Sequence, residues 1–298
     1  MATKFETIVS GVVVSKSMEK EQQHMIPSAY LSAWADPNPR PGHLGKVWVV
    51  QKADTNQKAQ KSPKKYFRQP ERFTLATNGL RDISVENALG SVEAWFGHTM
   101  AKIKAQRPLD GHDRSKLALF TSAMMLRTER IPRAMANMLR TIQSQAAKQE
   151  RKANIEPSYS LAIEGALPSI CGDAVSGGLT TTGQMLIRMN VSIFIADDDA
   201  GFVTGDEPVS VIVPGEWHAY PTHPDVEITL PLSPRHIAYY SWKIPRLTYM
   251  PWDRYKVDRI NSRTIGTCHK EFVSWKGIVR PEWFLNDFEA ERANRAAS

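Results

Sequence analysis

The period of the hydrophobic residues changes part-way along the chain, and this change limits the folds available to it. Before about residue 152 the long apolar segments repeat at helical spacing, whereas after about residue 190 short apolar runs alternate with a period of two. Asp, Gly and Pro residues separate the later runs, as they do between successive antiparallel strands. We therefore predict an α+β fold, in which a helical N-terminal half packs against a mainly antiparallel β-sheet from the C-terminal half.

The same patterns place the individual elements. Helices are expected at 24–35, 84–107, 113–130 with a continuation to 152, and 257–272; strands are expected at 46–52, 191–199, 202–213, 226–234 and 236–243. Gly177 and Gly178 are expected to form a turn. We predict one domain at residues 22–285, preceded by an N-terminal arm at 1–21 and followed by a flexible tail at 286–298.

Composition and charge narrow the class of protein. The chain has 298 residues, of which 42% are hydrophobic, and no apolar run approaches the roughly 20 residues that cross a bilayer. The segment Ile8–Val14 is too short for the core of an export signal, so we expect a cytoplasmic protein without a membrane partner. Cys171 and Cys268 form no CxxC pair, which argues against a disulfide framework or a cysteine-rich zinc site. The net charge of +7 permits a nucleic-acid or nucleotide partner. Oligomeric state is not indicated.

Several short motifs occur in a recognisable order. They comprise His-x-x-Pro-x-x-Tyr-Leu at 24–31, a helix with Glu86 and Glu93, a helix with Arg127, Phe-x-Thr-x-Asp-x-Pro-Val at 202–209, Pro-Leu-Ser-Pro at 231–234, and Asn261 in a late helix. In this order they resemble the domain-of-unknown-function family 4238 over about residues 22–275. The resemblance implies a widespread microbial domain without a settled activity, so it supports the domain bounds more than a function.

The chain departs from the pattern of that family at one motif. The family often has Ser-Asp-Asn-Pro-Val where this chain has Gly-Asp-Glu-Pro-Val at 205–209. The aspartate and the proline are kept, whereas the neighbouring hydrogen-bonding side chains differ.

Four residues of these motifs are candidates for catalysis: His24, Glu93, Arg127 and Asp206. A histidine can move protons near neutral pH, and carboxylates can act as bases or hold a divalent metal ion. An arginine can stabilise negative charge that develops on a phosphate. Each has a structural alternative: His24 as a helix cap or surface residue, Asp206 in an Asx turn, and Glu93 with Arg127 as an ion pair between packed helices.

Four more residues are candidates for substrate contacts: Tyr30, Arg130, Ser233 and Asn261. Arg130 belongs to an arginine cluster with Arg127 and Arg133, and guanidinium groups match phosphates in a two-pronged geometry. The structural alternatives are a core position for Tyr30, with its hydroxyl anchored to backbone, and a solvated basic face for the arginines. The sequence identifies no cofactor.

Three hypotheses for the function remain open. The first is an enzyme that acts on phosphodiesters or nucleotides, such as a nuclease-like hydrolase, with the four catalytic candidates in one pocket. The second is a non-catalytic module that binds nucleic acid or protein through the basic stretch 52–72, where Tyr66 and Phe67 are interleaved for stacking on bases. The third is a structural or regulatory subunit. Motifs typical of dinucleotide binding, P-loop hydrolysis and serine hydrolysis are absent from the sequence.

Overall fold

The computed structural model describes residues 6–9, 12–15, 22–39, 45–77, 80–212, 223–246 and 249–285. The predicted tail at 286–298 and most of the predicted arm at 1–21 lie outside these ranges. Seven α-helices are described: α1 (Ser28–Leu31), α2 (Ser84–Lys104), α3 (Gly111–Leu126), α4 (Arg130–Ala153), α5 (Tyr159–Ala166), α6 (Ile170–Arg188) and α7 (Arg254–Thr267). Short 3₁₀ turns are described at Ser32–Trp34, Leu167–Ser169, Trp275–Gly277 and Pro281–Phe284.

Two larger sheets are described. The first has the order β11 (Ser210–Ile212), β12 (Glu227–Ser233), β13 (His236–Ser241), β9 (Asn190–Ala196) and β14 (Tyr249–Trp252). Its neighbours are antiparallel except for β9 and β14, which are parallel. The second sheet is antiparallel, with the order β10 (Thr204–Gly205), β15 (Glu271–Ser274), β4 (Val47–Gln51) and β5 (Lys58–Lys61).

Three strand pairs complete the described secondary structure: β1 (Glu6–Val9) with β2 (Val12–Ser15), β3 (Gln22–His24) with β6 (Arg68–Pro70), and β7 (Leu75–Thr77) with β8 (Leu80–Asp82). Together these elements confirm the predicted α+β fold, with a largely helical stretch at 84–188 and, after it, all five strands of the larger sheet. Strands β1–β8 lie before the helical stretch.

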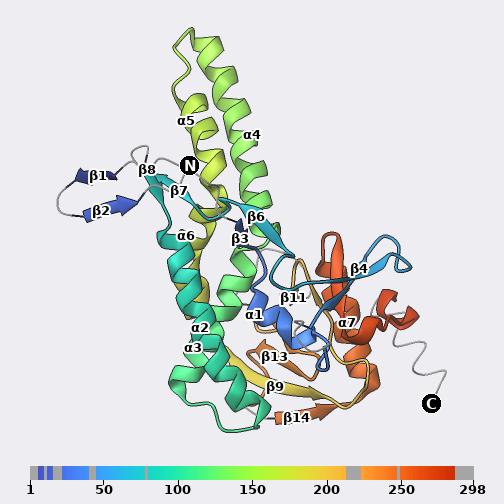
Figure 1. Cartoon of the computed structure of the whole chain (residues 1–298). Helices are drawn as coiled ribbons and strands as arrows, with labels where there is room; N and C mark the ends of the chain where they lie inside the picture. Colours follow the sequence, from blue (N-terminus) through green and yellow to red (C-terminus); the bar gives the residue numbers. More distant parts are fainter. Residues whose placement is uncertain are drawn as a thin grey trace.

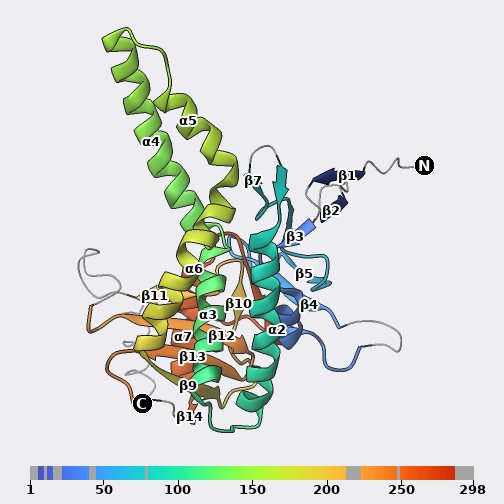
Figure 2. The same ribbon diagram turned by 90° about the vertical axis from the view of Figure 1, so that its left-hand side faces the viewer.

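The five-stranded sheet buries side chains on both faces. Successive residues of a strand point to opposite faces, so Ile193 joins the core beneath α2, α3 and α6, whereas Phe194 joins a second cluster with Val257 and Ile260 of α7. Figure 2 shows α2, α3 and α6 in front of this sheet. Another side of α7 contributes Ile265 to a third cluster, which includes residues of the four-stranded sheet. Helix α7 therefore lies between the two sheets.

Helices α4 and α5 form a hairpin that projects from the body of the molecule (Figure 1). Glu150, near the end of α4, holds the hairpin closed, because its carboxylate accepts hydrogen bonds from the backbone N–H groups of Ser158 and Tyr159 at 2.9 and 2.8 Å and from the hydroxyl of Ser160 at 2.5 Å. These donors lie at the start of α5, where backbone N–H groups have no partner within the helix. The buried carboxylate of Glu150 thus joins the end of α4 to the start of α5.

Several predicted boundaries were wrong. Gly177 and Gly178 form no turn and lie inside α6. The last helix ends at Thr267, so Phe272 belongs to strand β15 rather than to the helix. The expected helix at 24–35 is a strand followed by the four-residue helix α1 and a 3₁₀ turn.

Candidate functional site

The connection between α3 and α4, which we call the elbow (residues 127–129), brings most of the motifs together. Helix α3 ends at Leu126 and α4 begins at Arg130, so Pro132 lies in the first turn of α4. A proline is tolerated there because the first N–H groups of a helix need no acceptor within it. The interruption of the helical pattern at Pro132 thus corresponds to the start of a new helix.

Arg127 lies at the centre of the elbow, and its side chain is about 1% exposed. One Nη atom donates to Glu93 Oε1 on α2 at 2.6 Å, and the other donates to the backbone carbonyl of His24. The guanidinium carbon lies 5.5 Å from the centre of the Phe73 ring. The side chain therefore ties α2, strand β3 and the elbow to one another, as a structural ion pair would.

His24 reaches this cluster through its backbone and not through its imidazole. The ring atom Nε2 lies 3.1 Å from the carbonyl oxygen of Lys64. Burial is the main reason that the pKa of His24 is lowered from its ordinary value of 6.5. The imidazole is therefore largely neutral at pH 7, and its contact with Lys64 joins it to the segment that follows strand β5.

Arg72 also stabilises the elbow. Its Nε donates to the carbonyl of Arg127 at 3.2 Å, one Nη donates to the carbonyl of Thr128 at 3.1 Å, and the other pairs with Glu129 at 2.6 Å. The Arg72 side chain is almost fully buried, so these three partners satisfy a charge that water does not reach. Arg72 therefore contacts both backbone carbonyls and a side chain of the elbow.

Asp206 is a buried carboxylate in the loop after strand β10. Its two oxygens accept backbone N–H groups of His269 at 2.8 Å, Lys270 at 2.7 Å and Glu271 at 3.1 Å, immediately before and at the start of β15. Gly205 precedes it where a Cβ atom would come within 2.6 Å of the Glu271 carbonyl oxygen, so the two segments approach too closely for a side chain. Among the described contacts, no hydrogen bond or ion pair joins Asp206 to His24, Glu93 or Arg127.

Glu207, which the sequence did not single out, links the Asp206 loop to the elbow. Its carboxylate accepts the Thr128 hydroxyl at 2.6 Å and the backbone N–H of Arg130 at 2.7 Å, so it caps the start of α4. Burial raises the pKa of Glu207 above its ordinary value. A signal that could have identified it is its place beside Asp206 in the Gly-Asp-Glu-Pro-Val motif, where the family pattern has an amide.

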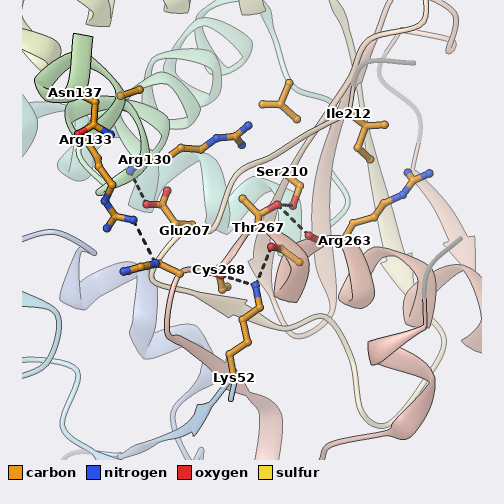
Figure 3. Close-up of a pocket in the computed structure, with 14 residues that line it drawn as sticks. Lys52, Arg130, Arg133, Asn137, Glu207, Ser210, Ile212, Arg263, Thr267 and Cys268 are labelled. Carbon is orange, nitrogen blue, oxygen red and sulfur yellow. Dashed lines mark hydrogen bonds between the residues drawn. The ribbon is translucent and has the colours of Figure 1, made fainter. Parts of the chain in front are cut away.

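A cavity of about 700 Å³ opens beside Glu207, between the first turns of α4, strand β11 and the end of α7 (Figure 3). We call it the Arg130 pocket. Its basic lining residues are Lys52, Arg130, Arg133, Arg263 and His269. Glu207 is the one acidic residue among those that line it in the described ranges.

The cations of the Arg130 pocket differ in how far they are already engaged. Lys52 donates to the carbonyls of Gly266 and Cys268 at 2.9 and 2.7 Å, at the end of α7. Arg263 pairs with Glu227 at 2.8 Å, and Arg133 contacts His269 at 3.3 Å.

The side chain of Arg130 is exposed and has no hydrogen-bond or ion-pair partner among the residues that the structure describes. Figure 3 shows it reaching across the pocket above Glu207. An unpaired guanidinium beside other cations favours an anionic ligand.

Comparison with known proteins adds one result. Residues 22–276 match the family described as protein of unknown function, DUF4238. The chain belongs to the DUF4238 family. All eight candidate residues and the whole Arg130 pocket lie within the part of the chain that matches DUF4238. No curated protein and no solved structure matches the chain significantly.

Two of the substrate-contact candidates of this DUF4238 chain hold segments that are distant in the sequence together. The hydroxyl of Tyr30 lies 2.6 Å from Thr204 Oγ1 and donates to the carbonyl of Pro231 at 2.7 Å. The amide of Asn261 on α7 accepts the N–H of Val203 and donates to the carbonyl of Gly201, each at 2.9 Å. Both side chains are buried, so their observed contacts are with neighbouring strands and loops.

Ser233, the remaining candidate of this kind, is paired with His236 in the tight turn between β12 and β13. Its Oγ accepts the N–H groups of Arg235 and His236 at 3.2 and 3.1 Å and lies 2.9 Å from His236 Nδ1. The hydroxyl proton therefore goes to Nδ1, which accepts it only while the imidazole is neutral. Burial is the main cause that lowers the pKa of His236 to about 4, with smaller effects from Lys104 and Arg235.

This environment predicts that acid destabilises the protein through His236. Between pH 6.5 and 4 the unfolded chain binds a proton at His236 that the folded chain does not bind, so the free energy of unfolding falls as the pH is lowered, by up to about 3 kcal/mol. Urea unfolding at pH 7 and pH 4 measures the change. The substitution His236→Gln should reduce the difference between the two pH values, and an equal difference in both proteins would contradict the assignment.

Two features are absent from the described residues. No group of three or more His, Cys, Asp and Glu side chains in these ranges is arranged to hold a metal ion. None of the helices described is both long and apolar enough to span a membrane.

Proposed function

We propose that the chain binds the phosphate groups of a nucleotide or nucleic acid in the Arg130 pocket, and that any cleavage of a phosphodiester by this chain takes place there. The exposed guanidinium of Arg130, reaching without a partner into a cavity lined by four other basic side chains, is the observation that supports this proposal. One guanidinium group can donate two parallel hydrogen bonds to two oxygens of a phosphate, and it stays charged at every physiological pH.

The neighbouring carboxylate does not neutralise the pocket. Both oxygens of Glu207 are engaged by Thr128 and by the backbone of α4, so the carboxylate serves the helix start rather than the Arg130 side chain. In addition, Arg133 reaches its acidic neighbour Glu129 only at 3.8 Å, and its side chain is 43% exposed. Its charge is therefore largely available to a ligand that enters the pocket.

The catalytic roles of His24, Glu93, Arg127 and Asp206 stay predictions. The observed contacts give these residues a supporting part in the proposal: Arg127 and Glu93 hold the elbow from which α4 begins, and Asp206 holds the loop that carries Glu207. Through the elbow they position Arg130 at the rim of the pocket.

The basic stretch at 52–72 offers less to a ligand. The ring of Phe67 is buried, and the hydroxyl of half-buried Tyr66 donates to Glu271 at 2.8 Å, so neither ring is presented as a free platform for stacking on a base.

The substitution Arg130→Gln tests the proposal. We expect it to weaken binding of a fluorescent nucleoside diphosphate by about 10-fold or more, because a charge-assisted hydrogen bond contributes about 1.5–3 kcal/mol. Equilibrium titration measures the dissociation constant, and Arg107→Gln, which removes an exposed arginine from the loop after α2, is the matched control.

Hydrolysis of a phosphodiester substrate, measured with and without magnesium, gives a second measurement on the same proteins. Any activity of the natural chain should fall in Arg130→Gln and persist in Arg107→Gln. Equal nucleotide affinity in all three proteins would refute the Arg130 pocket as the binding site.

A further inference from the structure

The basic residues of α4 gather on one side of the helix. At about 100° per residue, they fall within an arc of roughly 120°. They are Arg130, Arg133, Arg140, Lys148, Arg151 and Lys152. We call this surface the α4 stripe. Asn137, Thr141 and Ser144 lie between these residues on the same arc, and Ala134 is its one apolar residue.

The charges of the α4 stripe are exposed and have few acidic partners among the described residues. All six side chains are exposed, and the one ion pair described among them is the 3.8 Å contact of Arg133 with Glu129. Arg140 and Arg151 donate hydrogen bonds within their own helix, to the side chain of Asn137 at 3.3 Å and to the carbonyl of Ala147 at 3.0 Å. The acidic residue of α4, Glu150, points away from the stripe and caps α5.

The stripe continues the Arg130 pocket in a straight line. Arg130 is both a lining residue of the pocket and the first residue of the stripe. At 1.5 Å per residue, the distance along the helix from Arg130 to Lys152 is about 33 Å, close to one turn of a nucleic-acid duplex. Because α4 and α5 project from the body in both views, the far end of the helix stands away from the two larger sheets (Figures 1 and 2).

We infer that the α4 stripe binds the sugar–phosphate backbone of a nucleic-acid duplex, with one phosphate of that backbone in the Arg130 pocket. The inference rests on the proposed function and names its ligand. A row of exposed cations with little counter-charge gains free energy by releasing the counterions of a polyphosphate. The polar side chains between them can add hydrogen bonds to phosphate oxygens.

The chemistry of the stripe favours a duplex over a single strand and over a membrane. Single-strand sites add aromatic side chains on which bases stack, and the stripe has none. Helices that lie in a membrane surface insert an apolar face. The apolar face of α4 is covered near the start of the helix, where Ala136 is buried and Ile131 packs against the core. Met138 and Ile142 are exposed beside the stripe, so an anionic membrane is the competing partner in the test.

The test compares two triple variants of equal net charge. Arg140→Gln/Lys148→Gln/Arg151→Gln removes three charges from the α4 stripe, and Lys61→Gln/Lys64→Gln/Lys65→Gln removes three exposed charges near strand β5. Binding to a fluorescent 20-base-pair duplex is measured by anisotropy between 50 and 200 mM salt. The stripe variant should bind at least about 10-fold more weakly, with a slope of log affinity against log salt that is smaller by about 2.7, whereas the control should stay within about twofold.

Further measurements separate the alternatives. The stripe variant should keep the nucleotide affinity of the natural chain, because its Arg130 pocket is intact. If Arg130→Gln leaves nucleotide affinity unchanged, that result rejects the pocket as the nucleotide site without rejecting the stripe. Circular dichroism checks that α4 still folds, and Lys148→Gln/Lys152→Gln, which breaks none of the described contacts, should reduce the slope by about 1.8. Equal duplex binding by both triple variants overturns the inference. Tighter binding to a single strand, or to vesicles with anionic lipid, overturns it in favour of that ligand.

Discussion

Replacing Arg127 by methionine is expected to lower the free energy of unfolding by about 3 kcal/mol. The guanidinium is about 1% exposed and bonds both the Glu93 carboxylate and the carbonyl of His24. Methionine fills much of the same volume beside Phe73 but satisfies neither acceptor. Breaking one side of a buried ion pair leaves the other charge without compensation, which typically costs about 3–5 kcal/mol; the partly exposed Glu93, at 28%, keeps the expected loss at the lower end.

Urea unfolding at pH 7 measures this loss, and Glu93→Gln provides the matched comparison. The glutamine keeps a carbonyl oxygen for Arg127, so we expect a cost of about 1 kcal/mol. The double variant Arg127→Met/Glu93→Gln should be less destabilised than the sum of the two, since the residues are in contact. Unchanged stability in Arg127→Met together with lost activity would point instead to the catalytic role that the sequence suggested.

The pairing of Glu93 with Arg127 was within reach of the sequence. Glu93 lies at the border of the apolar face of α2, and a carboxylate at such a border needs a partner. Arg127 follows the next helix, which packs beside α2, so it was the natural candidate for that partner. The change of hydrophobic period likewise sufficed for the α+β fold, because the period depends on local alternation and not on distant contacts.

The Arg130 pocket was beyond such reasoning. Its walls come from the start of α4, strand β11 and the end of α7, which meet only after the two sheets have packed around α7. Periodicity says which face of an element is buried but not which distant element covers it. Arg130 itself was named from its arginine cluster, whereas Lys52, Glu207 and Arg263 could be joined to it only by the folded arrangement.

The wrong boundaries have the same origin. Glycine favours turns, yet Gly178 lies in α6 where a Cβ atom would stand 3.0 Å from the Leu126 side chain, so the small residue serves close packing of α6 on α3. Strand β15 replaces the expected end of α7 because Phe272 pairs with Val50 of β4. In both places a contact between distant segments outweighs the local preference.

Replacing Asp206 by alanine is expected to have an effect as large as that of Arg127→Met, about 3–4 kcal/mol. The Asp206 carboxylate accepts three backbone N–H groups at 2.7–3.1 Å, and hydrogen bonds to a charged group contribute about 1.5–3 kcal/mol each. The expected loss is smaller than the sum of the three hydrogen-bond contributions, because His269 and Lys270 are exposed and water can hydrogen-bond their N–H groups in the variant. Losing the carboxylate releases the turn that leads into β15, and with it the wall of the Arg130 pocket at His269.

Asp206→Asn should cost less, about 2 kcal/mol, because its amide offers one acceptor oxygen and turns N–H groups toward the donors. Asp199→Ala, which removes an almost fully exposed carboxylate, is the control and should change the free energy of unfolding by less than about 0.5 kcal/mol. Thermal and urea unfolding give the stabilities, and the nucleotide titration used for Arg130→Gln gives the affinity. If the role of Asp206 is structural, stability and nucleotide affinity should fall together, less in Asp206→Asn and more in Asp206→Ala. A catalytic Asp206 predicts the reverse pattern, in which Asp206→Asn folds and binds like the natural chain but turns over no phosphodiester.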